Sequence, residues 1–130
     1  MTGRVEGKMA FVTGAAQGIG EAIAIMLAKE GQKLLFPDIN EEGAKEVSEK
    51  INKDYSGSAY AISWDVSSEA QWQNALKQAE DSMGGLNILI NNAGIGGGST
   101  VEDTDYETFQ NIMKIDTDSV FLGCKYAFQL

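Results

Sequence analysis

The 130-residue sequence contains no histidine and a single cysteine, Cys124. Histidine is the commonest general base and the commonest metal ligand, so its absence excludes a Ser-His-Asp or Cys-His catalytic site within the chain. One cysteine likewise excludes an internal disulfide and a cysteine metal cluster. We therefore expect no metal site.

Basic residues are also scarce, with ten Lys and Arg against nineteen Asp and Glu and a net charge of −9. Nucleic acid binding needs clustered Lys and Arg to neutralise phosphates, and these residues are spread thinly. The apolar run from Met9 to Val12 is far shorter than a secretory or membrane-spanning segment. We expect a cytoplasmic protein without a nucleic-acid or membrane partner, since a reducing compartment suits a lone thiol.

Short apolar runs alternate along the chain with longer amphipathic segments. The expected strands are 9–13, 34–36, 59–64 and 86–90, and the expected helices are 18–31, 41–53, 68–83 and 104–130. Capping-box patterns, Ser68 to Gln71 and Thr104 to Glu107, open the last two helices. The alternation predicts an α/β fold, a Rossmann-type doubly wound parallel sheet with helices on both faces. We see no boundary within residues 1–130 and expect one domain.

A glycine-rich segment, Thr13 to Gly20, lies between the first expected strand and the first expected helix. In a dinucleotide site Gly14 would permit a tight turn, Gly18 would let the backbone approach a pyrophosphate, and Gly20 would let the helix pack near the strand. The helix N-terminus would offer free N–H groups to the phosphates. The alternative is a glycine-rich turn that binds no ligand.

Asp38 ends the second expected strand, near the spacing of about 20 residues at which dinucleotide sites place a carboxylate for the ribose hydroxyls. A carboxylate there would repel a 2′-phosphate by about 1 kcal/mol in water and about 4 kcal/mol near a protein surface. The 13–20 loop holds no Lys or Arg, and Ile39 follows Asp38 directly. The segment therefore predicts NAD rather than NADP. Alternatively, Asp38 is a helix N-cap or a turn residue.

Four motifs follow one another in the order of a known family. They are T-G-x-x-x-G-x-G at 13–20, Asp65-Val66 after the third strand, N-N-A-G at 91–94 after the fourth, and the stretch 113–123. In this the chain resembles the N-terminal portion of the short-chain dehydrogenases/reductases. Within this family, the residues of segments 65–69 and 118–124 most resemble those of the hydroxysteroid and secondary-alcohol dehydrogenases.

The resemblance implies a role for each motif. The phosphates of the cofactor would lie against Gly14, Gln17, Gly18, Ile19 and Gly20. The adenosine would be held by Asp38 and Ile39 at its ribose and by Asp65 and Val66 at its adenine, while Asn92, Ala93 and Gly94 would line the cofactor and support the central strand. A polar turn after a strand is the alternative for Asn91 and Asn92.

Position 116 departs from the family pattern, which usually has a catalytic Asn that helps to organise a proton relay. This chain has Asp116, which has no N–H to donate. Helical spacing places it on one inward stripe with Phe109, Ile112, Met113, Val120 and Cys124. The alternative is that Asp116 faces solvent or pairs locally.

The family's remaining catalytic residues, a Ser and a Tyr-x-x-x-Lys pair, have no counterpart in the chain. Tyr55, Tyr60, Tyr106 and Tyr126 are followed four positions on by Ala, Trp, Gln and Leu. Sheets of this kind have the strand order 3-2-1-4-5-6, so we expect a domain truncated after four strands, in the order 3-2-1-4, with an apolar edge at 86–90.

Three functional hypotheses follow. The chain is an inactive N-terminal fragment of an NAD(H)-dependent enzyme that acts on a secondary alcohol or ketone and forms homo-oligomers when complete. Alternatively, it is a non-catalytic dinucleotide-binding module or truncated subunit that joins a full-length partner. The third hypothesis is a split enzyme whose other half is supplied in trans.

Overall fold

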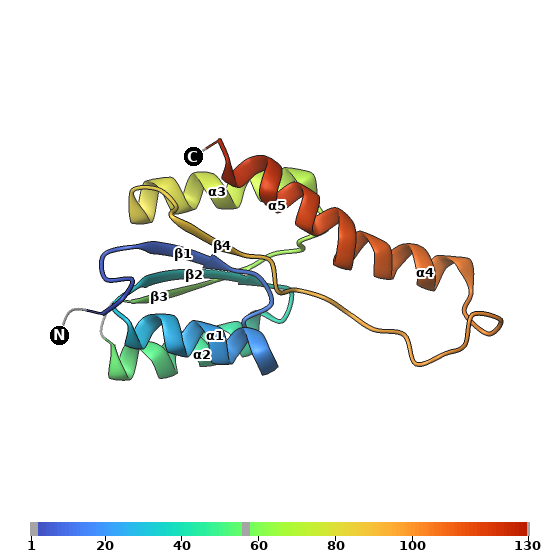
Figure 1. Cartoon of the computed structure of the whole chain (residues 1–130), viewed down its shortest axis with the longest axis horizontal. Helices are drawn as coiled ribbons and strands as arrows, with labels where there is room; N and C mark the ends of the chain where they lie inside the picture. Colours follow the sequence, from blue (N-terminus) through green and yellow to red (C-terminus); the bar gives the residue numbers. More distant parts are fainter. Residues whose placement is uncertain (1–2, 56–57, 130) are drawn as a thin grey trace.

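The computed structural model describes residues 3–55 and 58–129, and in them a parallel sheet lies between two layers of helices (Figure 1). The elements in chain order are β1 (Met9–Val12), α1 (Gly18–Lys29), β2 (Lys33–Asp38), α2 (Glu41–Asp54), β3 (Ala59–Ser63), α3 (Glu69–Met83), β4 (Ile88–Ile90), α4 (Tyr106–Met113), the π-helical turn η1 (Lys114–Asp118) and α5 (Ser119–Ala127). The strand order is β3-β2-β1-β4, which confirms the predicted topology.

Parallel pairing brings the carboxyl ends of all four strands to one edge of the sheet. β1 pairs with β2 through Met9 and Lys33 and with β4 through Ala10 and Ile88. β4 is shorter than the predicted 86–90, and Asn87, directly before it, bonds to the start of β1: its N–H donates to the Met9 carbonyl and its side chain accepts from the Met9 N–H, both at 2.9 Å. The loops that follow the strands therefore meet on one side of the molecule.

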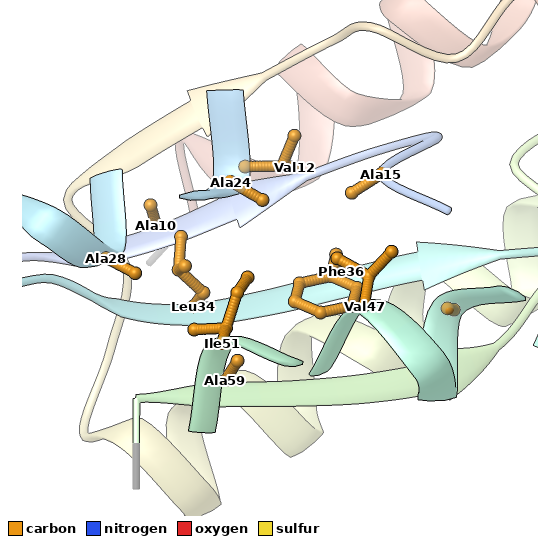
Figure 2. Packing of buried hydrophobic residues seen from close by; sticks show 11 residues of the cluster. Ala10, Val12, Ala15, Ala24, Ala28, Leu34, Phe36, Val47, Ile51 and Ala59 are labelled. Atoms are coloured by element: carbon orange, nitrogen blue, oxygen red, sulfur yellow. The ribbon is translucent and has the colours of Figure 1, made fainter. Parts of the chain in front are cut away.

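One hydrophobic core lies between the sheet and the layer formed by α1 and α2. Figure 2 shows Ala24 and Ala28 of α1 beside β1, and Val47 and Ile51 of α2 beside the β2 side chains. The small side chains let α1 lie close to the sheet, and its buried residues are Gly20, Ala24 and Ala28. The larger side chains of Ile19 and Met26 do not fit there and are 75% and 52% exposed, although their spacing of seven residues is typical of one helix face.

The second core lies on the opposite face, under α3 and α5, and is built on aromatic side chains. Trp64 and Trp72 meet edge to face with ring centroids 4.5 Å apart, and Phe11 of β1 lies 5.3 Å from the Trp64 ring. The Trp72 indole N–H donates to the Val66 carbonyl at 2.7 Å. These contacts fix the chain just after β3 against the centre of the sheet.

The C-terminal segment is helical without a break from Tyr106 to Ala127, as predicted apart from its ends, but it is not α-helical throughout. It consists of α4, the π-helical turn η1 and α5, and α4, none of whose residues is buried, projects beyond the sheet (Figure 1). Because the π-helical turn is wider than an α-helical one, it rotates the inward-facing side of α5 relative to that of α4. Ser119, Leu122, Gly123 and Tyr126 are therefore buried in α5, whereas Phe109, Met113, Val120 and Cys124 of the predicted stripe are exposed.

The two predicted capping boxes differ in detail from the structure. Ser68 does cap α3 by accepting from the Gln71 N–H, but the Gln71 side chain accepts from the Asp65 N–H at 2.8 Å instead of returning to Ser68. At α4 the cap is Asp105, which accepts from the Thr108 N–H at 2.7 Å. The Thr104 hydroxyl donates to the Thr100 carbonyl instead.

Residues 3–55 and 58–129 contain neither a membrane-spanning helix nor a cluster of metal-binding side chains. No helix there has both the length and the apolar character needed to cross a membrane. Within the same ranges, no three Cys, Asp or Glu side chains are grouped in a way that could hold a metal ion.

Candidate functional site

The glycine loop runs from the carboxyl end of β1 into the N-terminus of α1. Gly14 and Gly18 have φ values of +69° and +61°, a backbone conformation that residues with a Cβ rarely adopt. A Cβ added to Gly18 would meet nothing within 4 Å, so the backbone here is open to the outside. The conformation required of Gly18 and the free space above it fit the close approach of a ligand.

The N-terminus of α1 is uncapped. Asn40, Ser68 and Asp105 each cap a helix through a side-chain oxygen, whereas Gln17, at the same position of α1, makes no such hydrogen bond. Glu21 is the residue whose N–H begins the helical pattern, by donating to the Gln17 carbonyl. Because the preceding N–H groups and the positive end of the helix dipole are available, an anion would be stabilised there.

Gly20 is required by packing rather than by its conformation. A Cβ at this position would lie 2.2 Å from the Gly14 carbonyl oxygen and 2.5 Å from the Asn92 side-chain nitrogen. The first turn of α1 therefore lies directly on the loop and on the segment after β4. Gly20 supports the loop from behind and does not line the cleft described below.

The segment after β4 is tied to the glycine loop by Asn92. Its side-chain amide donates to the carbonyls of Thr13 and Gly14, at 3.2 and 3.1 Å. In return, the Thr13 hydroxyl oxygen accepts from the N–H groups of Asn92 and Ala93, both at 3.0 Å. This reciprocal bonding fixes the ends of β1 and β4 relative to each other, and it gives the N-N-A-G motif a structural role whether or not a ligand is bound.

Asp38 and Asp65 occupy equivalent places at the ends of β2 and β3. One oxygen of Asp38 accepts from the Asn40 N–H at 2.9 Å, and one oxygen of Asp65 accepts from the Ser67 N–H at 2.9 Å and from the Ser67 hydroxyl at 2.7 Å. Each carboxylate is thus held by a residue two positions later. Asp38 is the last residue of β2 and its carboxylate bonds to the turn that follows, while Asn40, and not Asp38, caps α2.

These segments enclose a cleft of about 390 Å³ at the carboxyl edge of the sheet. Eleven of the twelve predicted cofactor residues line it, all but Gly20: Gly14, Gln17, Gly18, Ile19, Asp38, Ile39, Asp65, Val66, Asn92, Ala93 and Gly94. The structure adds five residues that the sequence reasoning missed: Pro37, Asn40, Trp64, Ile95 and Ile115. Four of the five are immediate neighbours of predicted cofactor residues, and Ile115 is next to Asp116, so adjacency alone could have suggested them.

A wider groove of about 600 Å³ along α3 adjoins the cleft and shares Ile39, Trp64 and Asp65 with it. The same edge of the sheet therefore carries the uncapped helix start, the two carboxylates and both hollows. This is the position at which open parallel sheets bind ligands. The arrangement suits a long ligand with an anionic centre and hydroxyl groups at one end.

Asp116 lies in η1, outside the lining of the cleft but beside one of its segments. Its carboxylate accepts from the Ile95 N–H at 2.8 Å, and a Cβ on Gly94 would lie 3.4 Å from the same carboxylate oxygen. The residue is exposed, as the sequence alternative proposed, but its partner Ile95 is distant in the sequence. It joins the C-terminal helices to the loop that follows β4.

Comparison with known proteins agrees with this geometry. The model of the short chain dehydrogenase family matches residues 8–130. The chain is 38% identical over 125 residues to 3-beta-hydroxysteroid dehydrogenase of Comamonas testosteroni, covering 96% of this chain and 48% of the relative. It is 39% identical over 127 residues to 2,5-dichloro-2,5-cyclohexadiene-1,4-diol dehydrogenase of Sphingobium indicum, covering 98% of this chain and 50% of that relative.

Solved structures give the same picture. A 3-ketoacyl-(acyl-carrier-protein) reductase from Brucella melitensis, crystallised with NADH, superposes with a TM-score of 0.88 at 35% identity. That match covers 93% of this chain and 48% of the reductase. The chain thus spans about half the length of the relatives it matches.

Proposed function

The chain belongs to the short chain dehydrogenase family, and from this premise we propose that it is the cofactor-binding half of an NAD(H)-dependent oxidoreductase acting on a secondary alcohol or ketone. The family binds a nicotinamide dinucleotide, and the reductase from Brucella melitensis was crystallised with NADH. The observation that carries the proposal is the meeting of the uncapped α1 N-terminus with the Asp38 carboxylate in one cleft.

The residues present fit such a cofactor. The open backbone at Gly18 and the unpaired N–H groups at the start of α1 would hold the pyrophosphate. Gly14, Gln17 and Ile19 would line the same part of the cleft, and Gly20 would hold the helix against the loop. When bound, the nicotinamide would supply hydride transfer.

The adenosine end would lie toward β2 and β3. Asp38 would accept hydrogen bonds from the ribose hydroxyls, with Ile39 beside it, and Asp65 and Val66 would flank the adenine. A 2′-phosphate would be repelled by Asp38, and neither the 13–20 loop nor Ile39 supplies a compensating cation. We propose NAD over NADP on these grounds.

At the other end of the cleft, Asn92, Ala93 and Gly94 would line the nicotinamide side. The proposed role of Asp116 is to position this segment through the Ile95 N–H rather than to transfer a proton itself. In the family this position helps to organise a proton relay, and an acceptor-only carboxylate can reproduce only part of what an amide does.

Substrate class and assembly are proposed from the relatives and the surface. Both named relatives are dehydrogenases whose names specify hydroxylated ring compounds, which supports a secondary alcohol or the corresponding ketone. Exposed Phe109, Met113 and Phe121 on α4 and α5 support a homo-oligomer in the complete protein. Light scattering of the complete protein tests the assembly, and a monomer would contradict it.

A second candidate is a dinucleotide-binding module without turnover. It agrees with a sequence fact that the first candidate shares: none of the four tyrosines is followed by lysine at the Tyr-x-x-x-Lys spacing. Under both candidates the 130-residue chain should bind NADH and show no turnover with a panel of secondary alcohols and ketones. Turnover by the chain alone would contradict both.

Binding is tested with the two tryptophans, because Trp64 lines the cleft and Trp72 packs against the Trp64 ring. Bound NADH should quench their fluorescence by energy transfer, saturably and with competition by ADP. Trp72→Phe should retain most of the quenching, since Trp64, which lines the cleft, is still present. The absence of saturable quenching would refute the proposed function.

A further inference from the structure

Asp38 bonds to two separate segments of the chain. One carboxylate oxygen accepts from the Asn40 N–H at 2.9 Å, and the other accepts from the Ala16 N–H at 3.1 Å. Asn40 begins α2, and Ala16 is the middle of the glycine loop. A single side chain thus joins the end of β2, the start of α2 and the loop that leads into α1.

The other hydrogen bonds to the loop act on its first two residues. The Thr13 N–H donates to the Ile90 carbonyl, the Gly14 N–H donates to the Pro37 carbonyl, and Asn92 donates to the carbonyls of Thr13 and Gly14. The bond to Ala16 extends this support to the middle of the loop, directly before the uncapped start of α1. The carboxylate therefore holds the middle of the loop in place, directly before the uncapped N–H groups at the start of α1.

Packing at Gly43 reinforces the same junction. A Cβ on Gly43 would lie 3.3 Å from the Ala16 Cβ and 2.5 Å from the Asn40 side-chain nitrogen. The first turn of α2 therefore rests against the glycine loop, although Gly43 does not line the cleft. Asp38 sits where all three segments converge.

We infer that Asp38 is a positioning residue for the phosphate-binding loop, in addition to the ribose contact that it makes under the proposed function, on which this inference rests. Cofactor choice and loop order then depend on one carboxylate. Removing Asp38 would weaken binding even of a ligand that has no ribose hydroxyl for it to contact. A residue that acted on the ribose alone would leave such a ligand unaffected.

The binding test uses 2′,3′-dideoxyadenosine 5′-diphosphate, which keeps the diphosphate and lacks both hydroxyls, with ADP for comparison. Asp38→Ala should bind the dideoxy compound about tenfold more weakly than the unchanged chain, the loss expected for one charge-assisted hydrogen bond. Loss of a nearby negative charge would by itself strengthen binding of a diphosphate. Equal or tighter binding by Asp38→Ala would overturn the inference.

Amide hydrogen exchange tests the loop without any ligand. The Ala16 N–H should exchange about tenfold faster in Asp38→Ala than in the unchanged chain, and Asp38→Asn, which keeps one acceptor oxygen, should lie between them. Glu42→Ala is the matched control, because it removes an exposed carboxylate from the first turn of α2. It should leave Ala16 exchange unchanged.

The two measurements separate this inference from the proposed function. Unchanged Ala16 exchange in both Asp38 variants would overturn the positioning role even if NAD binds. Faster exchange, combined with no binding of ADP or NADH by the unchanged chain, would support the positioning role and refute the proposed function.

Discussion

The carboxylate of Asp116 accepts a hydrogen bond from the main-chain N–H of Ile95 at 2.8 Å. This bond joins the π-helical turn η1 to the segment that lines one end of the cleft. An asparagine could accept the same bond and would add an N–H donor, without the negative charge. Position 116 thus couples the C-terminal helices to the proposed nicotinamide side.

We expect Asp116→Asn to raise turnover in a complete enzyme. The experiment uses a chimera in which residues 1–130 replace the corresponding half of the Comamonas testosteroni dehydrogenase, to which this chain is 38% identical. The asparagine should raise kcat while KM for NAD changes little, and Asp116→Ala should lower kcat because the bond to Ile95 is lost. An unchanged or lower kcat in the asparagine variant would count against the idea.

Gly18 and Gly20 should respond differently to alanine. At Gly20 the new Cβ would overlap the Gly14 carbonyl at 2.2 Å, so we expect a loss of about 1–3 kcal/mol in unfolding free energy. At Gly18 there is free space but a φ of +61°, so the cost should be about 1–2 kcal/mol, with NADH affinity falling as well. Urea denaturation and fluorescence titration measure the two effects. Gly20→Ala as stable as the unchanged chain would contradict the packing described.

Asn52 protects the open edge of β3. Its side-chain amide donates to the Ala59 carbonyl and accepts from the Ala59 N–H, both at 2.8 Å, as a residue of a neighbouring strand would. Asn52→Ala should cost about 1–3 kcal/mol of unfolding free energy for the two bonds and increase self-association at this edge.

Exposed Lys53→Ala serves as the control for Asn52, since it changes a neighbouring side chain on α2 without touching β3. Urea denaturation and size-exclusion chromatography are the measurements. If the Asn52 and Lys53 variants behaved alike, the edge would not depend on this amide.

Glu69 joins α3 to α5 in a pH-dependent way. The Glu69 carboxylate accepts from the Tyr126 hydroxyl at 2.6 Å and from the Lys125 ammonium group at 2.9 Å. These two partners hold the pKa of Glu69 below its usual value of 4.5. A lowered carboxyl pKa stabilises the fold above the usual value, and this contribution is lost as pH falls below it.

Glu69→Gln should therefore lower Tm near neutral pH, and the difference from the unchanged chain should shrink as pH falls below 4.5. Glu80→Gln, an exposed carboxylate on the same helix, should show no such trend. A difference between Glu69→Gln and the unchanged chain that stayed constant across this range would disprove the pH dependence.

Much of the fold could be predicted because hydrophobic periodicity and glycine spacing are local signals. The strand order and the gathering of the predicted residues in one cleft follow from parallel topology once the strands are recognised. The buried face of α1 was harder to predict from the sequence, because the helix packs through glycine and alanine and leaves Ile19 exposed. Size, rather than apolarity, decides which side chains fit against this sheet.

The remaining features depend on contacts between distant residues. The π-helical turn at 114–118 changed the inward stripe, and no pattern of apolar residues marks it. The bond from Asp38 to Ala16 joins residues 22 positions apart, and the Asn52 contact with β3 depends on where α2 ends. Such bonds follow from the assembled tertiary structure and are not encoded in spacing.

We propose that the cleft binds NAD(H) in preference to NADP(H), because Asp38 lines it and neither the 13–20 loop nor Ile39 supplies a compensating cation. The most direct measurement compares Kd for NAD⁺ and NADP⁺ on the 130-residue chain by titration calorimetry at one ionic strength. We predict tighter binding of NAD⁺ by at least about tenfold, in line with the repulsion between two charges near a protein surface. Equal affinities, or tighter binding of NADP⁺, would contradict the claim.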